Sequence, residues 1–237
     1  QAQTSQQADN KNQDSLRFEQ DDQDTSVTLI NNNLYLTPAI VADSALGDIS
    51  SELTDALRRG SRVSLGLDTV RGVRTQIRGK NFDLRLGTGD LGELSGSPYS
   101  GYRQTDGRLS WIGASHRLGD DFVFGVQVDQ LDSFNKTVNA NPKISSAALA
   151  LNYDSDDEHN KKLRITVLNS QHTDEVKQTT QAQGAYLEGG FQLGRYSHEF
   201  GAYKAEPELY FGGNHLSSDQ QGAYWSFNRE GSRFTYS

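Results

Sequence analysis

Acidic side chains are the first candidates for chemistry in this chain. Asp154, Asp156 and Glu158 stand at alternate positions, a spacing that calcium-binding loops use. The segment lacks the glycine at the sixth position and the closing glutamate of such a loop, so a solvated acidic turn is the better interpretation. Glu206 and Glu208 share one face of a predicted strand and could do acid/base work. With basic residues nearby, they are read more simply as part of a mixed-charge surface.

The other motifs for metal or enzymatic chemistry are incomplete. The histidines have no metal-ligand spacing, and a chain without Cys has no thiolate ligand, thiol nucleophile or disulfide. Residues 87–92 (GTGDLG) resemble a phosphate loop, but no Lys-Ser/Thr pair follows and no βαβ pattern surrounds them. The G-x-S-x-G element of a serine hydrolase is absent. We therefore expect no enzyme, no metal site and no cofactor.

The composition limits both the partners and the fold. The chain of 237 residues carries 31 acidic and 23 basic side chains, a net charge of -8, which argues against nucleic acid as a partner. Only 34% of the residues are hydrophobic and the mean hydropathy is -0.72. These values suit a sheet with one apolar face and one wet face. No apolar run is long enough for a transmembrane helix, so a membrane role requires strands.

From residue 62 onward apolar and polar side chains alternate, which predicts an all-β fold of antiparallel strands. The run at 121–130 (DFVFGVQVDQ) is the clearest, 62–69 and 203–211 fit the same pattern, and 108–118 is ambiguous because both faces are apolar. The face expected to contact lipid contains Phe122, Phe124, Val126, Val128, Leu163, Ile165, Val167, Leu187, Phe191 and Leu193.

The opposite faces of these strands would line an interior. That lining is hydrophilic and carries both signs of charge, so it would favour water and polar solutes. Its expected members are Asp83, Arg85, Gln127, Asp129, Arg164, Thr166, Glu188, Gln192, Lys204, Glu206 and Glu208.

The connections between the runs alternate in length, as they do in up-and-down barrels of outer membranes. Short turns have no need to alternate with long loops in a soluble sandwich. The expected short turns lie at 119–120, 194–197 and 229–232, the intermediate one at 154–161, and the long polar loops at 87–107, 132–143, 170–183 and 212–220.

Three regions are predicted along the chain. Residues 1–24, rich in Gln, Asn and Asp, are expected to be a disordered leader, with a tether or adaptor for a periplasmic partner as the functional alternative. Residues 25–60 hold short strands and a helix from Ser51 to about Arg59, before the antiparallel barrel region at 61–237. Because the chain begins at Gln1 and contains no Met, we expect a processed N-terminal end.

Residues 184–193 (GAYLEGGFQL) and 196–211 (YSHEFGAYKAEPELYF) resemble outer-membrane translocator barrels, autotransporter β-domains among them. In those barrels a strand ending in a short turn is followed by a strand with a Glu-Pro-x-Leu element, which stands here at 206–209. The resemblance implies a bacterial outer-membrane β-barrel that moves polar cargo or anchors an exported polymer or protein. Its partners would be outer-membrane lipid and other envelope or secretion components.

The C-terminal end departs from that resemblance. Such barrels close with a strand ending in an aromatic residue, whereas this chain ends in FTYS, with too few residues after the turn at 229–232 for a spanning strand. We hypothesise that the chain is the N-terminal part of a larger barrel, cut inside a hairpin. The alternative class is a soluble extracellular β-sandwich, a binding or adhesion module with ligand-binding loops. An enzyme on either scaffold is the third interpretation.

Overall fold

The computed structural model describes residues 24–59, 63–95, 101–133, 142–157, 159–174, 176, 178–216, 219–230 and 235–236. The expected leader at 1–24 therefore lies outside the described residues, except for Asp24. The elements are β1 (Asp24–Thr25), β2 (Thr28–Thr37), β3 (Ile40–Ser50), the 3-10 turn η1 (Leu57–Arg59), β4 (Thr69–Arg78), β5 (Phe82–Ser95), β6 (Gly101–Leu118), β7 (Phe122–Asp132), β8 (Lys143–Asp154), β9 (Lys162–Thr173), β10 (Thr179–Leu193), β11 (Tyr196–Ala205), β12 (Tyr210–Phe211), β13 (Asn214–His215), β14 (Gln220–Glu230) and β15 (Thr235–Tyr236).

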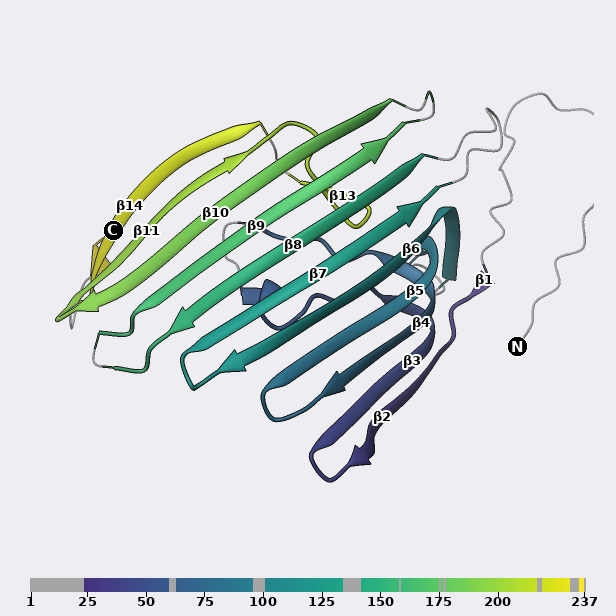
Figure 1. Ribbon diagram of the computed structural model, residues 1–237, viewed down its shortest axis with the longest axis horizontal. Helices are drawn as coiled ribbons and strands as arrows, with labels where there is room; N and C mark the ends of the chain where they lie inside the picture. Colours follow the sequence, from purple (N-terminus) through teal and green to yellow (C-terminus); the bar gives the residue numbers. More distant parts are fainter. Residues whose placement is uncertain are drawn as a thin grey trace, which may run out of the picture.

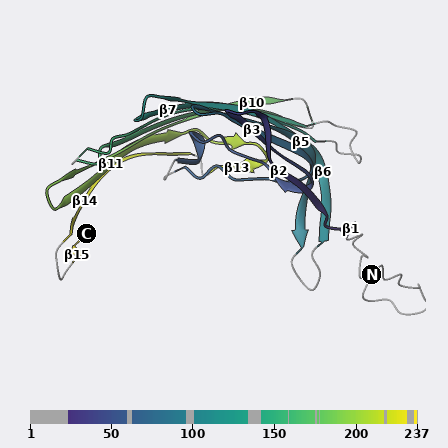
Figure 2. The same cartoon turned by 90° about the horizontal axis from the view of Figure 1, so that it is seen from below.

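The long strands form one antiparallel meander, which confirms the predicted all-β fold class. Each strand from β2 to β11 pairs with its neighbour in sequence, and β14 follows β11 in the same sheet. The sheet curves into an arch with a convex and a concave face, and the short β12–β13 hairpin lies inside the arch (Figure 2). Among the described residues the arch is open, because β2 pairs only with β3 and the strand order ends at β15. These residues form one extended sheet, not the two facing sheets of a sandwich.

The two ends of the arch differ in their connections, as the loop pattern predicts. Tight connections such as Gly119–Asp121 and 194–195 lie at one end, together with those at 38–39, 79–81 and 155–161 (Figure 1). Gly119 and Gly194 adopt positive φ values of 67° and 60°, which glycine permits without strain. At the opposite end the connections at 51–68, 133–142 and 206–219 are longer, whereas those at 96–100 and 174–178 are shorter than 155–161, so the long loop predicted at 170–183 is wrong. We call these the short-turn end and the long-loop end.

The predicted loop at 87–107 is wrong. β5 continues to Ser95 and β6 begins at Gly101, so this pair of strands extends beyond its neighbours and bends toward the concave side (Figure 2). A register shift between Asp90 and Gly92 marks the bend. The fully buried Tyr102 fixes it, since its hydroxyl donates to the Asp90 carbonyl oxygen. Glycine-rich composition at 87–92 was misread as a loop, although it supplies the small residues of a bend.

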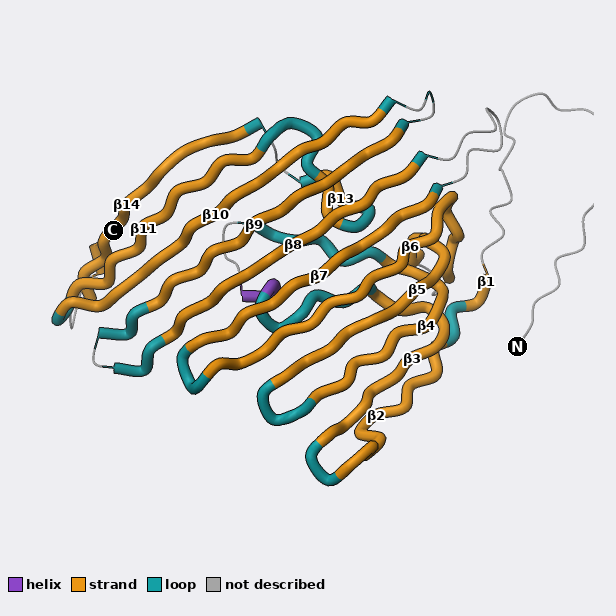
Figure 3. Tube along the Cα trace, in the orientation of Figure 1, coloured by secondary structure: helices purple, strands orange, loops and turns teal. Residues whose placement is uncertain are grey.

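The expected helix at 51–59 and the expected strand at 62–69 are both wrong. Residues 51–59 and 63–68 cross the concave face as an irregular segment, and among these described residues the only helical part is the 3-10 turn η1 (Figure 3). We call this the first inward segment. Side chains of the sheet bind its backbone: Gln127 Oε1 accepts from the Thr54 N–H, and Asn152 Nδ2 donates to the Ala56 carbonyl. Because these tertiary bonds satisfy the backbone groups, a helix is not needed.

A second inward segment, residues 206–216, replaces the second half of the strand predicted at 203–211. β11 ends at Ala205, and the chain turns at Pro207 and at Glu208, which has a φ of 57°. The β12–β13 hairpin then returns over the concave face. Leu209 and Phe211 are buried against the sheet and do not face outward with β11. Proline disfavours a continuing strand here because it has no N–H for the ladder.

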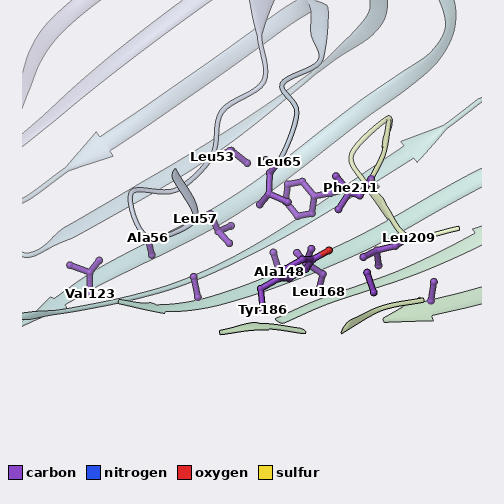
Figure 4. Close-up of a cluster of buried hydrophobic side chains, with 14 residues drawn as sticks. Leu53, Ala56, Leu57, Leu65, Val123, Ala148, Leu168, Tyr186, Leu209 and Phe211 are labelled. Atoms are coloured by element: carbon purple, nitrogen blue, oxygen red, sulfur yellow. The ribbon is translucent and has the colours of Figure 1, made fainter. Parts of the chain in front are cut away.

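The main hydrophobic core lies between the inward segments and the concave face (Figure 4). Leu57, Leu65 and Phe211 pack on small side chains of the sheet such as Ala148. Glycines make room beneath the first segment: a Cβ on Gly125 would stand 2.5 Å from the Ala56 Cβ. A second cluster, including Leu109 and Trp111, explains why 108–118 is apolar on both faces.

Candidate functional site

The convex face carries the ten apolar residues that the sequence predicts on one side of the strands. Cross-strand pairs place them in shared rows, for example Val126 beside Leu149 and Val167 beside Ala185. Most of these side chains are exposed, with Val126 at 40% and Leu193 at 59%. Neighbouring strands add further exposed apolar residues, including Val73 and Ile112, and together they form what we call the apolar belt. The structure thus places Phe122, Phe124, Val126, Val128, Leu163, Ile165, Val167, Leu187, Phe191 and Leu193 on one face.

Aromatic rings border the apolar belt at the short-turn end. Phe122 lies against Tyr153 with 4.8 Å between ring centroids, and His198 stacks between Phe191 and Trp225 at 4.8 and 5.9 Å. Trp225 is 72% exposed. We call this group the aromatic border. Its residues come from β7, β8, β10, β11 and β14, so they follow the edge of the belt and not a single strand.

Alternating charges border the belt at the long-loop end. Three ion pairs there measure 2.7, 2.9 and 3.0 Å, between Arg71 and Asp48, Arg108 and Asp90, and Lys143 and Asp132. Each residue is the cross-strand partner of the next, so the signs alternate across six strands. This charged row consists of Asp48, Arg71, Asp90, Arg108, Asp132 and Lys143.

The apolar belt crosses the strands obliquely. Val128 on β7 and Asn169 on β9 lie in one cross-strand row, yet the belt includes the first and excludes the second. At the short-turn end the belt stops at Phe82 on β5, whereas on β10 it continues three rows further, to Leu193. The border of the apolar belt therefore shifts by roughly one residue per strand. This corresponds to an angle of about 25–40° between the strand direction and the direction perpendicular to the belt.

The concave face holds most of the residues predicted to line an interior. Asp83, Arg85, Gln127, Asp129, Thr166 and Glu188 are buried there, and Arg164 and Gln192 lie on the same face, partly exposed.

Three of the predicted lining residues do not share that position. Lys204 pairs across strands with Ala185, so it lies exposed on the convex face, and its prediction is wrong. Glu206 follows the end of β11, where its Oε2 accepts from the Gln183 N–H, and Glu208 stands in the turn before β12. The two glutamates therefore do not form a carboxylate pair on one strand.

Buried polar side chains hold the first inward segment in place. Gln127 is the centre: besides its bond to Thr54, its Nε2 donates to the Glu52 carbonyl at 3.1 Å and to Asp129 Oδ1 at 2.9 Å. Charges at the segment's far end are also paired, since Arg59 bridges Asp55 at 2.8 Å and Asp154 at 3.2 Å. The polar residues thus hold the first inward segment against the concave face, and they do not all face open water.

The two inward segments contact each other through Asp68. Its carboxylate accepts from the Gly213 N–H at 2.9 Å and from Asn214 Nδ2 at 3.0 Å, and Gly66 lies beneath the Asn214 side chain. Burial raises the pKa of Asp68 above its ordinary value, while these two hydrogen bonds lower it in part. A cavity of about 370 Å³ remains between the two segments and β10–β11, lined by residues that include Tyr186 and Tyr203.

A second cavity on the concave face, of about 390 Å³, is strongly basic. It lies at the short-turn end, between the 3-10 turn η1 and strands β4 to β7. We call it the basic cavity. Its charged lining residues are Asp55, Arg58, Arg78, Lys80, Asp83, Arg85 and Arg117.

Several of these features were missed from the sequence. The inward segments show helix-like spacing at 51–59 and strand-like alternation at 62–69 and 203–211, so neither pattern revealed that they cross the sheet. The aromatic border was not predicted because aromatic residues occur within the predicted strands about as often as at their ends. The cations of the basic cavity come from residues far apart in sequence, and only the pairing of β4 to β7 brings them together.

Within the described ranges, no group of three or more His, Asp or Glu side chains is arranged to hold a metal ion. In the same part of the chain, no helix has the length and apolarity needed to cross a membrane. Comparisons with protein-family models, with curated proteins and with solved structures gave no match to this chain. What can be said of function therefore rests on the geometry of the two faces.

Proposed function

We propose that this chain forms part of the wall of a bacterial outer-membrane β-barrel. The convex face contacts lipid, and the concave face lines a polar passage that the inward segments narrow. Such a barrel serves as a pore or translocator, or anchors an exported polymer or protein. The edges at β2 and β14–β15 pair with further strands to close the ring, since unpaired edges in lipid leave backbone groups unsatisfied.

The oblique apolar belt is the observation that carries this proposal. Strands of outer-membrane barrels are tilted by about 35–45°, so a lipid layer of constant depth must cut across successive strands at different positions. A soluble protein has no reason to shift an exposed apolar band by about a residue per strand. β7 with 11 residues and β9 with 12 are also long enough to span a bilayer when tilted, for which about 9–11 are needed.

The borders of the belt support the same orientation. Aromatic rings gather at the interfaces of membrane barrels because they are apolar in the body and polar at the edge. The aromatic border would lie at the periplasmic interface, where short turns are found, and the charged row at the outer one. Side-chain hydrogen bonds also satisfy polar groups inside the belt, as between Ser44 Oγ and Thr75 Oγ1 at 3.1 Å. His116 is the exposed polar residue that interrupts it, between Phe82 and Phe124.

Depth-dependent lipid contact tests the proposal. The chain has no Cys, so a single introduced thiol carries a fluorophore at one known position. We would label Val126→Cys, Val128→Cys, Asp132→Cys and Asn169→Cys in phosphatidylcholine vesicles and quench with lipids brominated at defined depths. All four side chains lie on the convex face.

We expect deep bromines to quench the label at Val126 most strongly and the label at Asp132 least. Val128 and Asn169 form the matched pair, because they share a cross-strand row and differ only in their place relative to the oblique belt. Bromines placed deep in the bilayer should quench the label at Val128 more strongly than the label at Asn169. Equal quenching of all four labels, or a chain that stays in the aqueous phase without detergent, would instead favour a soluble binding module.

A further inference from the structure

The basic cavity has a charge opposite to that of the protein. It presents five cationic side chains and two carboxylates in a chain whose net charge is -8. Both carboxylates are already engaged: Asp83 accepts from Arg85 Nε at 2.7 Å and from Gln76 Nε2 at 2.6 Å, and Asp55 pairs with Arg59. Arg78 is paired with Asp43, so the uncompensated positive charge of the cavity comes from Arg58, Lys80 and Arg117.

Three of the cations have no ion-pair partner in the part of the chain that the structure describes. Arg58 lies on η1, Lys80 in the turn between β4 and β5, and Arg117 near the end of β6. Their side chains are exposed, so water and salt screen the electrostatic repulsion between them. Arg85 is different, because its guanidinium is buried in the cavity wall with only its Nε bound to Asp83. A buried guanidinium beside exposed cations is the arrangement of an anion site.

We infer that the basic cavity binds the oxyanion group, carboxylate or phosphate, of a small polar solute. A volume of about 390 Å³ lies in the range of small-ligand sites. Arginine favours oxyanions because its planar guanidinium donates two parallel hydrogen bonds. Most of the lining of the cavity lies on the concave face, with Phe82 of the apolar belt at its edge, so we take its ligand to be a water-soluble species and not a lipid headgroup. The binding of an oxyanion does not depend on the proposed function. Only the location of the basic cavity at the periplasmic end of a passage rests on that function.

Calorimetric titration of the full chain in detergent tests this inference. The probes are D-glucuronate, which carries a carboxylate, D-glucose 6-phosphate, which carries a phosphate, and D-glucose, which carries neither. We expect one or both anions to bind saturably, more weakly as NaCl is added, and glucose not to bind. Which anion binds more tightly identifies the group that the cavity takes.

The test variant is Lys80→Gln/Arg117→Gln, since neither side chain has a protein ion pair to lose within the described residues. It should weaken anion binding about tenfold, and adding Arg58→Gln should weaken it further. The matched control is Lys162→Gln/Arg195→Gln, which also removes one lysine and one arginine. Both side chains are exposed outside the cavity and have no ion pair within the described residues, so binding should be unchanged. The inference is overturned if neither anion binds saturably, if glucose binds as well, or if the control weakens binding as much as the test variant. Lipid contact is measured separately, so a failure here leaves the membrane proposal standing, and the reverse also holds.

Discussion

Replacing Gln127 by Met should release the first inward segment from the concave face. Methionine has nearly the volume and shape of glutamine, so the packing on Ala148 and Gly113 is retained while the hydrogen bonds are lost. The bonds removed are those from the Thr54 N–H, to the Glu52 carbonyl and to Asp129. All three partners would remain close to the sheet without a protein partner.

The size of the effect follows from the burial of these groups. Gln127 is 1% exposed and Asp129 3%, so water replaces the lost bonds poorly. A buried hydrogen bond contributes about 1 kcal/mol, and a buried group left unpaired costs about 1–3 kcal/mol. Loss of three bonds therefore destabilises the docked segment by about 3 kcal/mol or more. This corresponds to an increase of roughly a hundredfold in the equilibrium constant for local opening.

Hydrogen exchange at the Thr54 amide measures this opening directly, because its acceptor is the substituted side chain. We expect exchange of residues 52–57 to accelerate by about two orders of magnitude, with exchange in β7 and β8 nearly unchanged. Gln130→Met is the matched control: Gln130 lies on the same strand, and its Nε2 also donates to the Asp two residues on, but it is exposed on the convex face. Equal exchange at 52–57 in the two variants would refute the role assigned to Gln127.

Three further predictions concern pH, packing and lipid. Because burial raises the pKa of Asp68 above 3.8 in the folded chain, the folded state holds a proton that the unfolded state has released. The free energy of unfolding should therefore decline as pH rises from about 4 through the raised pKa of Asp68. The Asp68→Asn variant should flatten this decline, measured as the urea midpoint against pH. An unchanged slope in the variant would contradict the role of Asp68. Gly184→Val should cost about 1–3 kcal/mol of unfolding free energy, since a Cβ there would stand 2.6 Å from Leu209 Cδ2; an unaltered denaturation midpoint would disprove the clash. In a Trp111→Phe variant, the fluorescence of Trp225 should shift to shorter wavelength on insertion into vesicles, and a constant emission maximum would count against the aromatic border as a lipid contact.

The strands were predictable where each face has one kind of neighbour. β7 alternates strictly from Phe122 to Asp129 because its convex side chains up to Val128 are apolar and its concave ones lie among polar groups and small residues. Hydrophobicity reports burial, however, and not the face of a sheet. On β11, Tyr203 and Ala205 face inward against Tyr186 and the second inward segment, while Lys204 lies beyond the belt. On β11 the apolar side chains therefore face the concave side and Lys204 faces the convex side, the reverse of β7. The sequence prediction assigned Lys204 to the concave face because it assumed the same arrangement on both strands.

The inward segments could not be predicted from local patterns. The helix signals at 51–59 are genuine, with acidic residues at the start and arginines at the end, but they are outweighed by bonds from Gln127 and Asn152. Those partners stand 73 and 96 positions away in sequence. The anion-binding arrangement of the basic cavity was missed for the same reason, since strand pairing alone brings Lys80 near Arg117.

The contact between Asp68 and the β12–β13 hairpin has a consequence for the order of assembly. The hydrogen bond from the Gly213 N–H spans 145 positions, and nearly the whole meander lies between its two ends. Contacts of such long sequence separation form late, after the intervening hairpins have brought the distant parts together. A chain still being assembled would thus have the second segment free, while bonds from Gln127 and Asn152 can already hold the first segment on β7 and β8. Asp68 can bond to the β12–β13 hairpin only once β11 is in place. The hairpin then connects the two inward segments across the concave face and stabilises the curvature of the arch.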